Sequence, residues 1–413
     1  SRHRDKLLEE GFDKRLNEKL KMLTRELPVP PRVMGFVEEI KDFKYKSMAM
    51  EKIAEEIMLE QHCVGVDKLV ILVPERDRLQ DLIIRVAKNL AVEGEITDAL
   101  SCLDLIDDAK KKLDVLLAME HRCALKLCKE LPKLLKMTIK TMNMVRGKTT
   151  IDPVEEAKIR LDLAIAFKFA GRDRDYKDSL NKAVKMLENL RPRNINNPME
   201  CRVAAEIYGY YAATLYVLGD PRSDELLREA IKYINMLPSR IRVRSMIKLL
   251  TWLIFADWFS VVMEMIQLEG MELVLPLIRR SLIVEYVENE RYDEALDLAL
   301  GMAPTPKDRV ETYLCYAKAI LQTPVKKRVF DILKKALEEA QKIEDVPEQL
   351  RLRLRIAGVY ARAGVVDEAQ SVFHDTVNDF GRVDDEETRN MLMADAAPIL
   401  YLIERQRQEL EIE

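Results

Sequence analysis

Three side chains in the N-terminal half of the chain carry donor atoms that bind metals. His121, Cys123 and Cys128 supply the nitrogen and sulfur ligands that zinc prefers. On a helix, these spacings place only His121 and Cys128 on roughly one face, and no fourth ligand lies nearby in the sequence. We therefore expect buried or incidental side chains at these positions, and neither a metal nor a cofactor in the protein.

A phosphate-binding loop is a second candidate. Gly147-Lys148-Thr149 looks like the end of such a loop, but the motif needs another glycine five residues before Gly147, where Met142 stands. The segment also follows a helical sequence instead of a buried strand. No histidine pairs with a nucleophile in a turn, and the GxSxG, HExxH and GxGxxG motifs do not occur. We therefore expect a protein that is not an enzyme.

Clusters of arginine and lysine are the remaining candidates for a binding site. Arginine holds a carboxylate through two hydrogen bonds, so such clusters suit an acidic peptide or a chain-terminal carboxylate. The alternative is that these side chains are solvated and paired with nearby glutamate and aspartate. The clusters recur near the same point of successive helical segments, at Arg240, Arg242 and Arg244, at Arg279-Arg280, at Lys326-Lys327-Arg328, and at Arg351, Arg353 and Arg355.

The composition indicates which elements must position these side chains. The chain has 413 residues, of which 71 are acidic and 67 basic, so its net charge of −4 argues against a dedicated polyanion binder. Hydrophobic residues make up 48%, which is enough for sizeable cores and too much for a disordered chain. Only 13 glycines and 6% aromatic residues are present, and this balance favours helices over strands and turns.

The sequence does not predict a membrane or secreted protein. The most apolar run, Leu249 to Met263, is shorter than the ~20 residues of a membrane span and contains Asp257, so we expect a buried helical hairpin there. The segment Ser1 to Leu8 lacks the apolar core of a signal peptide, and the cysteines show no CxxC spacing. We therefore expect a cytoplasmic location.

The proline distribution suggests where the main body of the chain begins. Pro28, Pro30 and Pro31 form a stiff connection, because each proline fixes φ and lacks a backbone donor. We therefore divide the chain into an N-terminal amphipathic helix with its connection (1–31), a helical array (32–380) and a C-terminal capping helix (381–413). The apolar stripe of the first helix could pack on the chain's own array or on a second copy, and a homodimer could form through that helix or through an end of the array. This stripe consists of Leu8, Phe12, Leu16, Leu20 and Leu23.

One local pattern recurs along the array. A small residue is followed three positions later by a bulky one, and four positions after that by a glycine. The small residue allows close helix packing, and the glycine accepts the positive φ that ends a helix. This spacing predicts a repeated unit in which a second helix folds back on the first. The pattern occurs at Ala87/Leu90/Gly94, Ala164/Phe167/Gly171, Ala212/Leu215/Gly219 and Ala357/Tyr360/Gly364.

These residues resemble the tetratricopeptide repeat, a helical hairpin of 34 residues with small, aromatic, glycine and alanine positions in this order. The resemblance implies an all-α fold, a right-handed superhelical solenoid of about nine antiparallel helical hairpins. The best match is Ile356, Ala357, Tyr360, Gly364, Val366, Ala369 and Phe373. A second match has Glu290 in the place of the glycine and comprises Leu282, Ile283, Tyr286, Tyr292 and Ala295.

The resemblance also implies where a partner would bind. In this family the first helix of each hairpin lines a concave groove, which would bind another protein or an acidic peptide segment. The family's asparagine-and-lysine clamp for a carboxylate does not carry over, because Gly358, Val284 and Ala213 occupy the expected asparagine position. The family phasing would turn four basic side chains toward the groove, namely Arg280, Lys318, Arg351 and Arg362.

We therefore predict a non-catalytic protein–protein interaction scaffold. The alternative is a helical-repeat protein that binds nucleic acid through a basic inner stripe, which the net charge of −4 makes less favourable. A third role, the binding of a small ligand within the array, has no specific residue in its support.

Overall fold

The computed structural model describes Lys14 and residues 29–268 and 270–412. This part of the chain contains nineteen α-helices, α2 to α20, four short 3-10 helices and no strand, which confirms the prediction of an all-α fold. The amphipathic helix expected within residues 1–28 lies outside the described residues, apart from Lys14.

The helices form two compact units. The first, which we call the terminal unit, combines Ser1–Val86 with Tyr286–Glu413, and the second, the central unit, comprises Ala87–Glu285. Helices α4 (Arg76–Val92) and α14 (Leu275–Glu288) each contain a boundary between the units.

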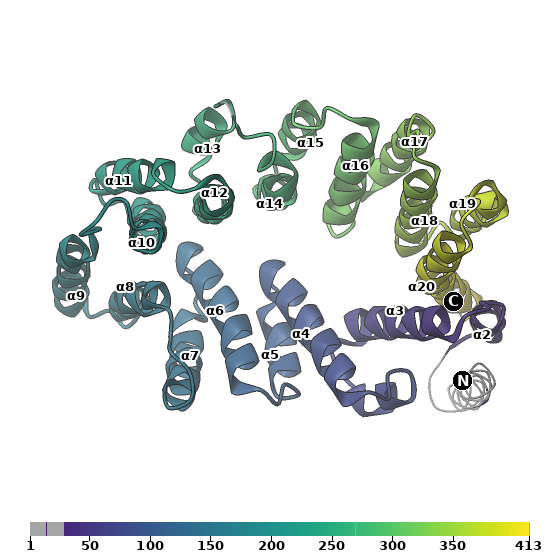
Figure 1. Ribbon diagram of the computed structural model, residues 1–413, viewed down its shortest axis with the longest axis horizontal. Coiled ribbons are helices and arrows are strands. Elements are labelled where there is room, and N and C mark those ends of the chain that lie inside the picture. Colours follow the sequence, from purple (N-terminus) through teal and green to yellow (C-terminus); the bar gives the residue numbers. More distant parts are fainter. Residues whose placement is uncertain (1–13, 15–28, 269, 413) are drawn as a thin grey trace. The chain divides into compact units, whose positions relative to one another are not determined.

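The central unit contains consecutive helices that pack in pairs (Figure 1), among them α6 with α7, α8 with α9, and α10 with α11. The first helix of each pair also contacts the first helix of the next, as in helical-repeat proteins. The helices are α5 (Ile96–Leu103), α6 (Ala109–Leu125), α7 (Leu131–Arg146), α8 (Pro153–Phe169), α9 (Asp173–Met186), α10 (Pro198–Val217), α11 (Ser223–Asn235), α12 (Ser239–Phe255) and α13 (Phe259–Met265). The 3-10 helix η2 covers Leu187–Leu190.

The terminal unit contains helices from both ends of the chain. Here α16 pairs with α17, and α18 with α19, while α16 also contacts α18. The helices are α2 (Pro31–Glu38), α3 (Phe43–Gln61), α15 (Tyr292–Gly301), α16 (Pro306–Ile320), α17 (Val329–Ala340), α18 (Val346–Arg362), α19 (Val366–Asn378) and α20 (Glu386–Ile412). Short 3-10 helices cover Val66–Ile71, Lys326–Arg328 and Asp379–Arg382.

The repeated glycines end helices in the predicted way. Gly94, Gly171, Gly219 and Gly364 have φ values of 80°, 72°, 74° and 81°. In each case, the amide after the glycine donates to the carbonyl of the bulky residue of the pattern at 2.9–3.0 Å. This six-to-one hydrogen bond is the mark of a Schellman turn, which satisfies the last carbonyls of the helix. The bulky residues are Leu90, Phe167, Leu215 and Tyr360.

Four further helices end in the same turn without a glycine, one of them α3 at His62, which has a φ of 50°. Leu127, Asp257 and Glu290 adopt φ values of 49°, 58° and 61°. The matching six-to-one bonds measure 2.9 Å and run from Cys128 to Cys123, from Trp258 to Leu253 and from Arg291 to Tyr286. The left-handed conformation costs a residue with a side chain about 1–2 kcal/mol. These turns therefore form although their backbone conformation is unfavourable. Glu290 stands in the place of the glycine of the pattern, whereas Leu127 carries no residue type that marks a turn.

Two helix-interior glycines allow especially close packing. A Cβ atom on Gly209 of α10 would lie 2.9 Å from Leu249 Cδ1 of α12. A Cβ atom on Gly358 of α18 would lie 2.9 Å from Ile399 Cδ1 of α20. At both crossings the glycine therefore lets a leucine or isoleucine side chain of the neighbouring helix reach the helix backbone.

The apolar run Leu249–Met263 forms the end of α12, the turn at Asp257 and the start of α13, in agreement with the expected helical hairpin. Leu253 and Val262 are fully buried within it. Across the described residues, no helix is both long enough and apolar enough to cross a membrane.

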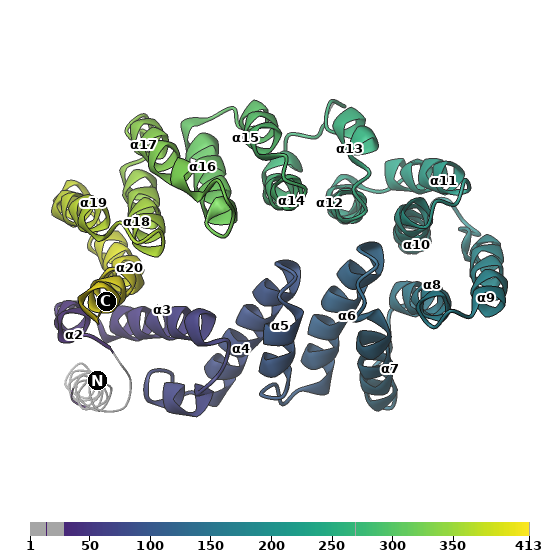
Figure 2. The same cartoon turned by 180° about the vertical axis from the view of Figure 1, so that it is seen from behind.

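The C-terminal helix packs against the N-terminal part of the chain. Figures 1 and 2 show α20 beside α3 and α18, and α2 also contacts it. The Tyr401 hydroxyl donates to Glu60 of α3 at 3.0 Å, and Lys52 of α3 pairs with Asp395 at 2.9 Å. Residues 408–412 have the exposed character expected of a solvent-facing cap. The sequence did not indicate that the rest of this helix joins the two ends of the chain.

Candidate functional site

The four predicted binding residues lie in both units. Arg280 is on α14 in the central unit, Lys318 is on α16, and Arg351 and Arg362 are on α18 in the terminal unit. Because α16 and α18 pack together, the terminal unit brings Lys318 and Arg362 near each other, whereas Arg351 lies about three turns before Arg362 on α18.

The three arginines have carboxylate partners. Arg280 pairs with Glu93 at 3.2 Å, Arg362 with Glu56 at 2.7 Å, and Arg351 with Glu348 at 2.8 Å and with Asp395 at 3.5 Å. At these positions the arginines are therefore paired with nearby acidic residues, as the alternative interpretation of the basic clusters expected. Such partly exposed pairs contribute little to stability, so a partner's carboxylate could replace the resident one at small cost.

Lys318 differs from the three arginines. Its side chain is exposed and forms no ion pair with any residue that the structure describes. Desolvation by the surrounding protein and the positive charges of Arg362 and Arg355 together lower its pKa to about 8, against the opposite effect of Glu56. Lys318 is thus open to water, yet it lies among protein atoms and other cations, where its own charge is poorly compensated.

A second polar group, which the sequence did not reveal as a unit, lies in the central unit. Helix α6 contacts α8, α10 and α12, and polar side chains of these helices meet between them. Glu120 and Asp162 have no exposed surface, and His121 is 8% exposed. The group comprises Glu120 and His121 of α6, Glu155, Lys158 and Asp162 of α8, and Tyr210 of α10. We call it the histidine–carboxylate cluster.

His121 is the centre of this cluster. Its Nδ1 atom lies 2.7 Å from Glu120 Oε2 and 3.5 Å from Asp162 Oδ2, and its Nε2 atom lies 2.7 Å from Glu155 Oε2. The Tyr210 hydroxyl donates to Asp162 at 2.7 Å. The approach of His121 to Glu120 lacks hydrogen-bond alignment, so both Glu120 oxygens and His121 Nδ1 have no hydrogen-bond partner in the described part of the chain.

Burial and crowding shift the pKa values in the cluster. Burial raises the pKa of Glu120 well above its usual value, and the Asp162 carboxylate raises it further. Burial alone would lower the pKa of His121, but the Glu120 and Glu155 carboxylates outweigh it and raise this pKa well above 6.5. Burial alone would raise the pKa of Glu155, but the positive charges of His121 and Lys158 outweigh burial and lower this pKa. The cluster therefore retains protons that these groups would lose in water.

Aromatic rings cover the cluster. The Lys158 ammonium group lies 4.3 Å from the centre of the Trp252 ring and 5.5 Å from that of Tyr210. The two rings meet edge to face with centres 5.5 Å apart. Because these contacts exclude water, electrostatic interactions among the enclosed charges are strong.

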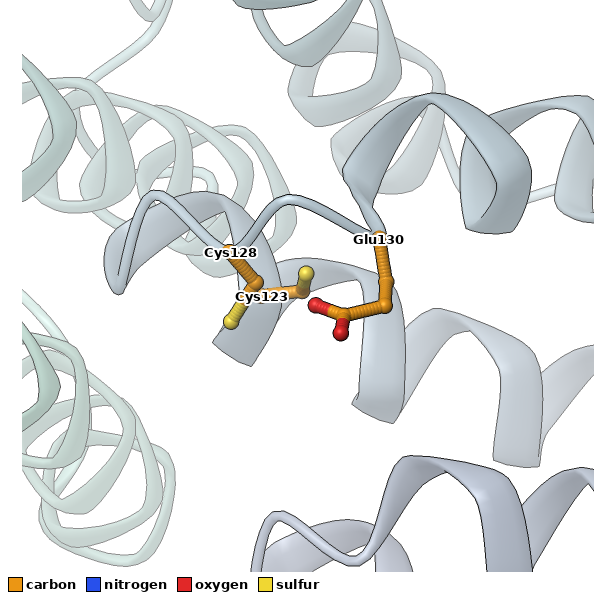
Figure 3. A group of neighbouring side chains, drawn as sticks. All are labelled: Cys123, Cys128 and Glu130. Atoms are coloured by element: carbon orange, nitrogen blue, oxygen red, sulfur yellow. The ribbon is translucent and has the colours of Figure 1, made fainter.

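The two cysteines considered above form a separate group with Glu130. Figure 3 shows the Glu130 carboxylate directed toward Cys123 and Cys128, and one donor atom of each lies within 4.8 Å of the others. The turn at Leu127 brings the two cysteines together. A hydrogen bond with the Cys123 thiol and the charges of Arg122 and Lys126 lower the pKa of Cys128, although burial opposes them. The same hydrogen bond and burial raise the pKa of Cys123.

The predicted relation between His121 and Cys128 therefore does not occur. His121 turns toward carboxylates, whereas Cys128 lies beyond the end of α6 and meets Cys123 across the turn. The additional donors near His121 are Glu120, its neighbour in the sequence, and Asp162, which belongs to the next helical pair. One signal was visible in the sequence, because Asp162 interrupts the apolar run of α8 between Leu161 and Leu163.

Comparison of the chain with protein-family models, with curated proteins and with solved structures gave no match. The all-α fold with paired helices is therefore a finding of the structure, and the resemblance to the tetratricopeptide repeat rests on the residue pattern and its turns.

Proposed function

We propose that the chain is a non-catalytic scaffold of tetratricopeptide-like repeats that binds an acidic segment of another protein. The observation that carries this proposal is the environment of Lys318, an exposed lysine whose pKa is lowered to about 8 by desolvation and by Arg362 and Arg355. A carboxylate from a partner would add to the partial charge compensation that Glu56 provides.

The cations involved come from two adjacent first helices. Lys318 is on α16, and Arg355 and Arg362 are on α18. Arg355 lies 4.0 Å from Glu311, which is a weak pair, and Arg362 pairs with Glu56. We call Lys318, Arg355 and Arg362 the cation cluster. Three cations held close together attract an extended acidic peptide more strongly than three isolated surface lysines would, because each peptide carboxylate interacts with several of them.

The proposal includes the repeat architecture. The Schellman turns at Gly94, Gly171, Gly219 and Gly364, and those at Leu127, Asp257 and Glu290, support a chain of repeated helical hairpins. A right-handed solenoid of about nine such hairpins is the arrangement that the family pattern favours. The cytoplasmic location and the association of two copies stay predictions.

Peptide titration tests the proposed binding. A fluorescent peptide rich in glutamate and aspartate is titrated with the chain and with Lys318→Glu, and anisotropy gives the Kd. Reversal of this charge should weaken binding about tenfold or more, which is about 1.4 kcal/mol. The matched control is Lys335→Glu, an exposed lysine of α17 with the same change of charge, and it should have little effect.

Two results would contradict the proposal. An equal loss in Lys318→Glu and Lys335→Glu would show that only net charge matters. Tighter and steeply salt-dependent binding of a single-stranded RNA, lost in Lys318→Glu, would instead identify the cation cluster as a nucleic-acid surface.

A further inference from the structure

We propose that Glu120, His121 and Asp162 form a binding site for one divalent transition-metal ion of the Zn²⁺ or Mn²⁺ type in the central unit. The site would join α6, which carries Glu120 and His121, to α8, which carries Asp162.

The donor atoms already have a spacing suited to a metal. Metal bonds of about 2.0 Å in tetrahedral geometry place two ligand atoms about 3.3 Å apart. The Nδ1 atom of His121 lies 2.7 Å from a Glu120 oxygen and 3.5 Å from an Asp162 oxygen, values that bracket this separation. One donor atom of each of the three residues lies within 4.8 Å of the other two. Small side-chain adjustments would therefore suffice for coordination.

Unsatisfied donors point to a ligand at this place. Both carboxylate oxygens of Glu120 and the Nδ1 atom of His121 are buried without a hydrogen-bond partner in the part of the chain that the structure describes. Buried polar atoms are nearly always satisfied in folded proteins, because an unsatisfied one costs free energy. A single cation between Glu120, His121 and Asp162 would satisfy Nδ1 and both carboxylates together.

The surrounding hydrogen bonds match those of metal ligands in other proteins. A metal-bound histidine commonly donates a hydrogen bond from its second ring nitrogen to a carboxylate, and this bond orients the ring. Here Nε2 of His121 lies 2.7 Å from Glu155, so Nδ1 faces Glu120 and Asp162. The Tyr210 hydroxyl lies 2.7 Å and 2.8 Å from the two Asp162 oxygens and fixes that carboxylate in the same way.

Charge balance favours a divalent ion. In the metal-bound form Glu120, Asp162 and Glu155 would be ionised and the imidazole neutral, and the resident cation is Lys158, which pairs with Glu155 at 3.5 Å. Two negative charges then stay uncompensated in a buried environment, which is unfavourable. A divalent cation compensates both.

The donor set also limits the kind of metal. One imidazole and two carboxylates suit Zn²⁺, Mn²⁺ or Fe²⁺, whereas Ca²⁺ and Mg²⁺ prefer oxygen ligands alone. The group of Cys123, Cys128 and Glu130 would instead bind a thiophilic ion. A thiolate-to-metal charge-transfer band therefore distinguishes that group from the proposed site.

Metal titration of the full chain tests the proposal. Chelator-treated protein is titrated with Zn²⁺ in competition with a chromogenic chelator, and with Co²⁺ as a spectroscopic probe. We expect one bound ion, visible d–d absorption, no thiolate-to-cobalt charge-transfer band, and a higher melting temperature with metal. Absence of both binding and a melting shift in the unaltered chain would overturn the proposal without recourse to any variant.

Variants then assign the ligands. Asp162→Asn, which keeps the side-chain shape, should abolish tight binding, and Glu155→Gln should weaken it by about 10–100-fold as expected for a residue that orients a ligand. Cys128→Ser is the control and should bind as the unaltered chain does. A charge-transfer band, or loss of binding in Cys128→Ser with retention in Asp162→Asn and Glu155→Gln, would assign the ion to the cysteines and refute the site. Circular dichroism checks that each variant is folded.

Discussion

The cation cluster of the terminal unit and the histidine–carboxylate cluster of the central unit are alike in design and opposite in charge. Both gather like charges on the first helices of successive pairs, α16 and α18 in one case, α6 and α8 in the other. In both, desolvation and a like-charged neighbour move a pKa toward the neutral form, downward for Lys318 and upward for Glu120. The difference is access to water, since Lys318 is exposed and Glu120 is fully buried.

That difference determines how the missing charge is supplied. Around Lys318, water and salt screen the repulsion, so the cluster persists without a partner and a ligand can come and go. Around Glu120, burial prevents screening, so protons or a metal ion must be bound within the fold. One cluster therefore suits reversible recognition and the other a permanent part of the core.

Replacement of the central histidine should have the largest effect. His121→Ala leaves the Glu155 carboxylate without its closest partner in the cluster, and removal of one member of a buried ion pair costs about 3–5 kcal/mol. Lys318→Met should change stability by less than about 0.5 kcal/mol, as for other exposed positions. Urea unfolding of both variants in chelator measures this contrast. Equal changes in the free energy of unfolding would mean that burial does not explain the difference between the two clusters.

The pH dependence of stability should come next in size. Glu120 and His121 have raised pKa values in the folded state, so each retains a proton that the unfolded chain loses above pH 4.5 and 6.5 respectively. Stability should therefore fall as the pH rises above these values, by up to about 1.4 kcal/mol per pH unit for each proton. The lowered pKa of Glu155 acts in the opposite pH range, with its contribution lost below pH 4.5.

Urea unfolding of metal-free protein at several pH values measures this slope. The variant His121→Gln removes one of the two titrations and should flatten the profile above pH 6.5. An unchanged slope in this variant would show that the pH dependence originates elsewhere in the molecule.

The smallest effect concerns the left-handed turns in each unit. Glu290→Gly in the terminal unit should stabilise the chain by about 1 kcal/mol, because glycine adopts the φ of 61° without strain. Asp257→Gly in the central unit should gain less, because Asp257 lies 3.5 Å from the Lys126 ammonium group and that interaction is lost. Thermal unfolding compares the two variants. Destabilisation by Glu290→Gly would show that its side chain makes a favourable contribution in the folded protein.

Local sequence patterns predicted the local structure well. The spacing of Ala357, Tyr360 and Gly364 gave a helix, a left-handed turn and a return helix, and the structure has all three. At Glu290, which replaces the glycine of the pattern, the structure has the same left-handed turn. These features depend on contacts between residues a few positions apart, which a sequence displays directly.

Contacts between distant segments were not predictable in this way. Nothing in α20 indicates that Tyr401 meets Glu60 of α3, because an apolar helix face is complementary to many others. The histidine–carboxylate cluster was missed for the same reason, since Glu120 and Asp162 belong to different helical pairs.

By itself the sequence determined the helical class, the repeated hairpins and their turns, because hydrophobic periodicity and backbone preference act locally. Only the tertiary structure decided which charges meet and which are buried. In the folded protein Lys318 lies near Arg362 at a position exposed to water. His121, Glu120 and Asp162 lie together in the buried interior. The energy of a charge depends on its surroundings, and for these residues the surroundings come from helices far apart in the chain.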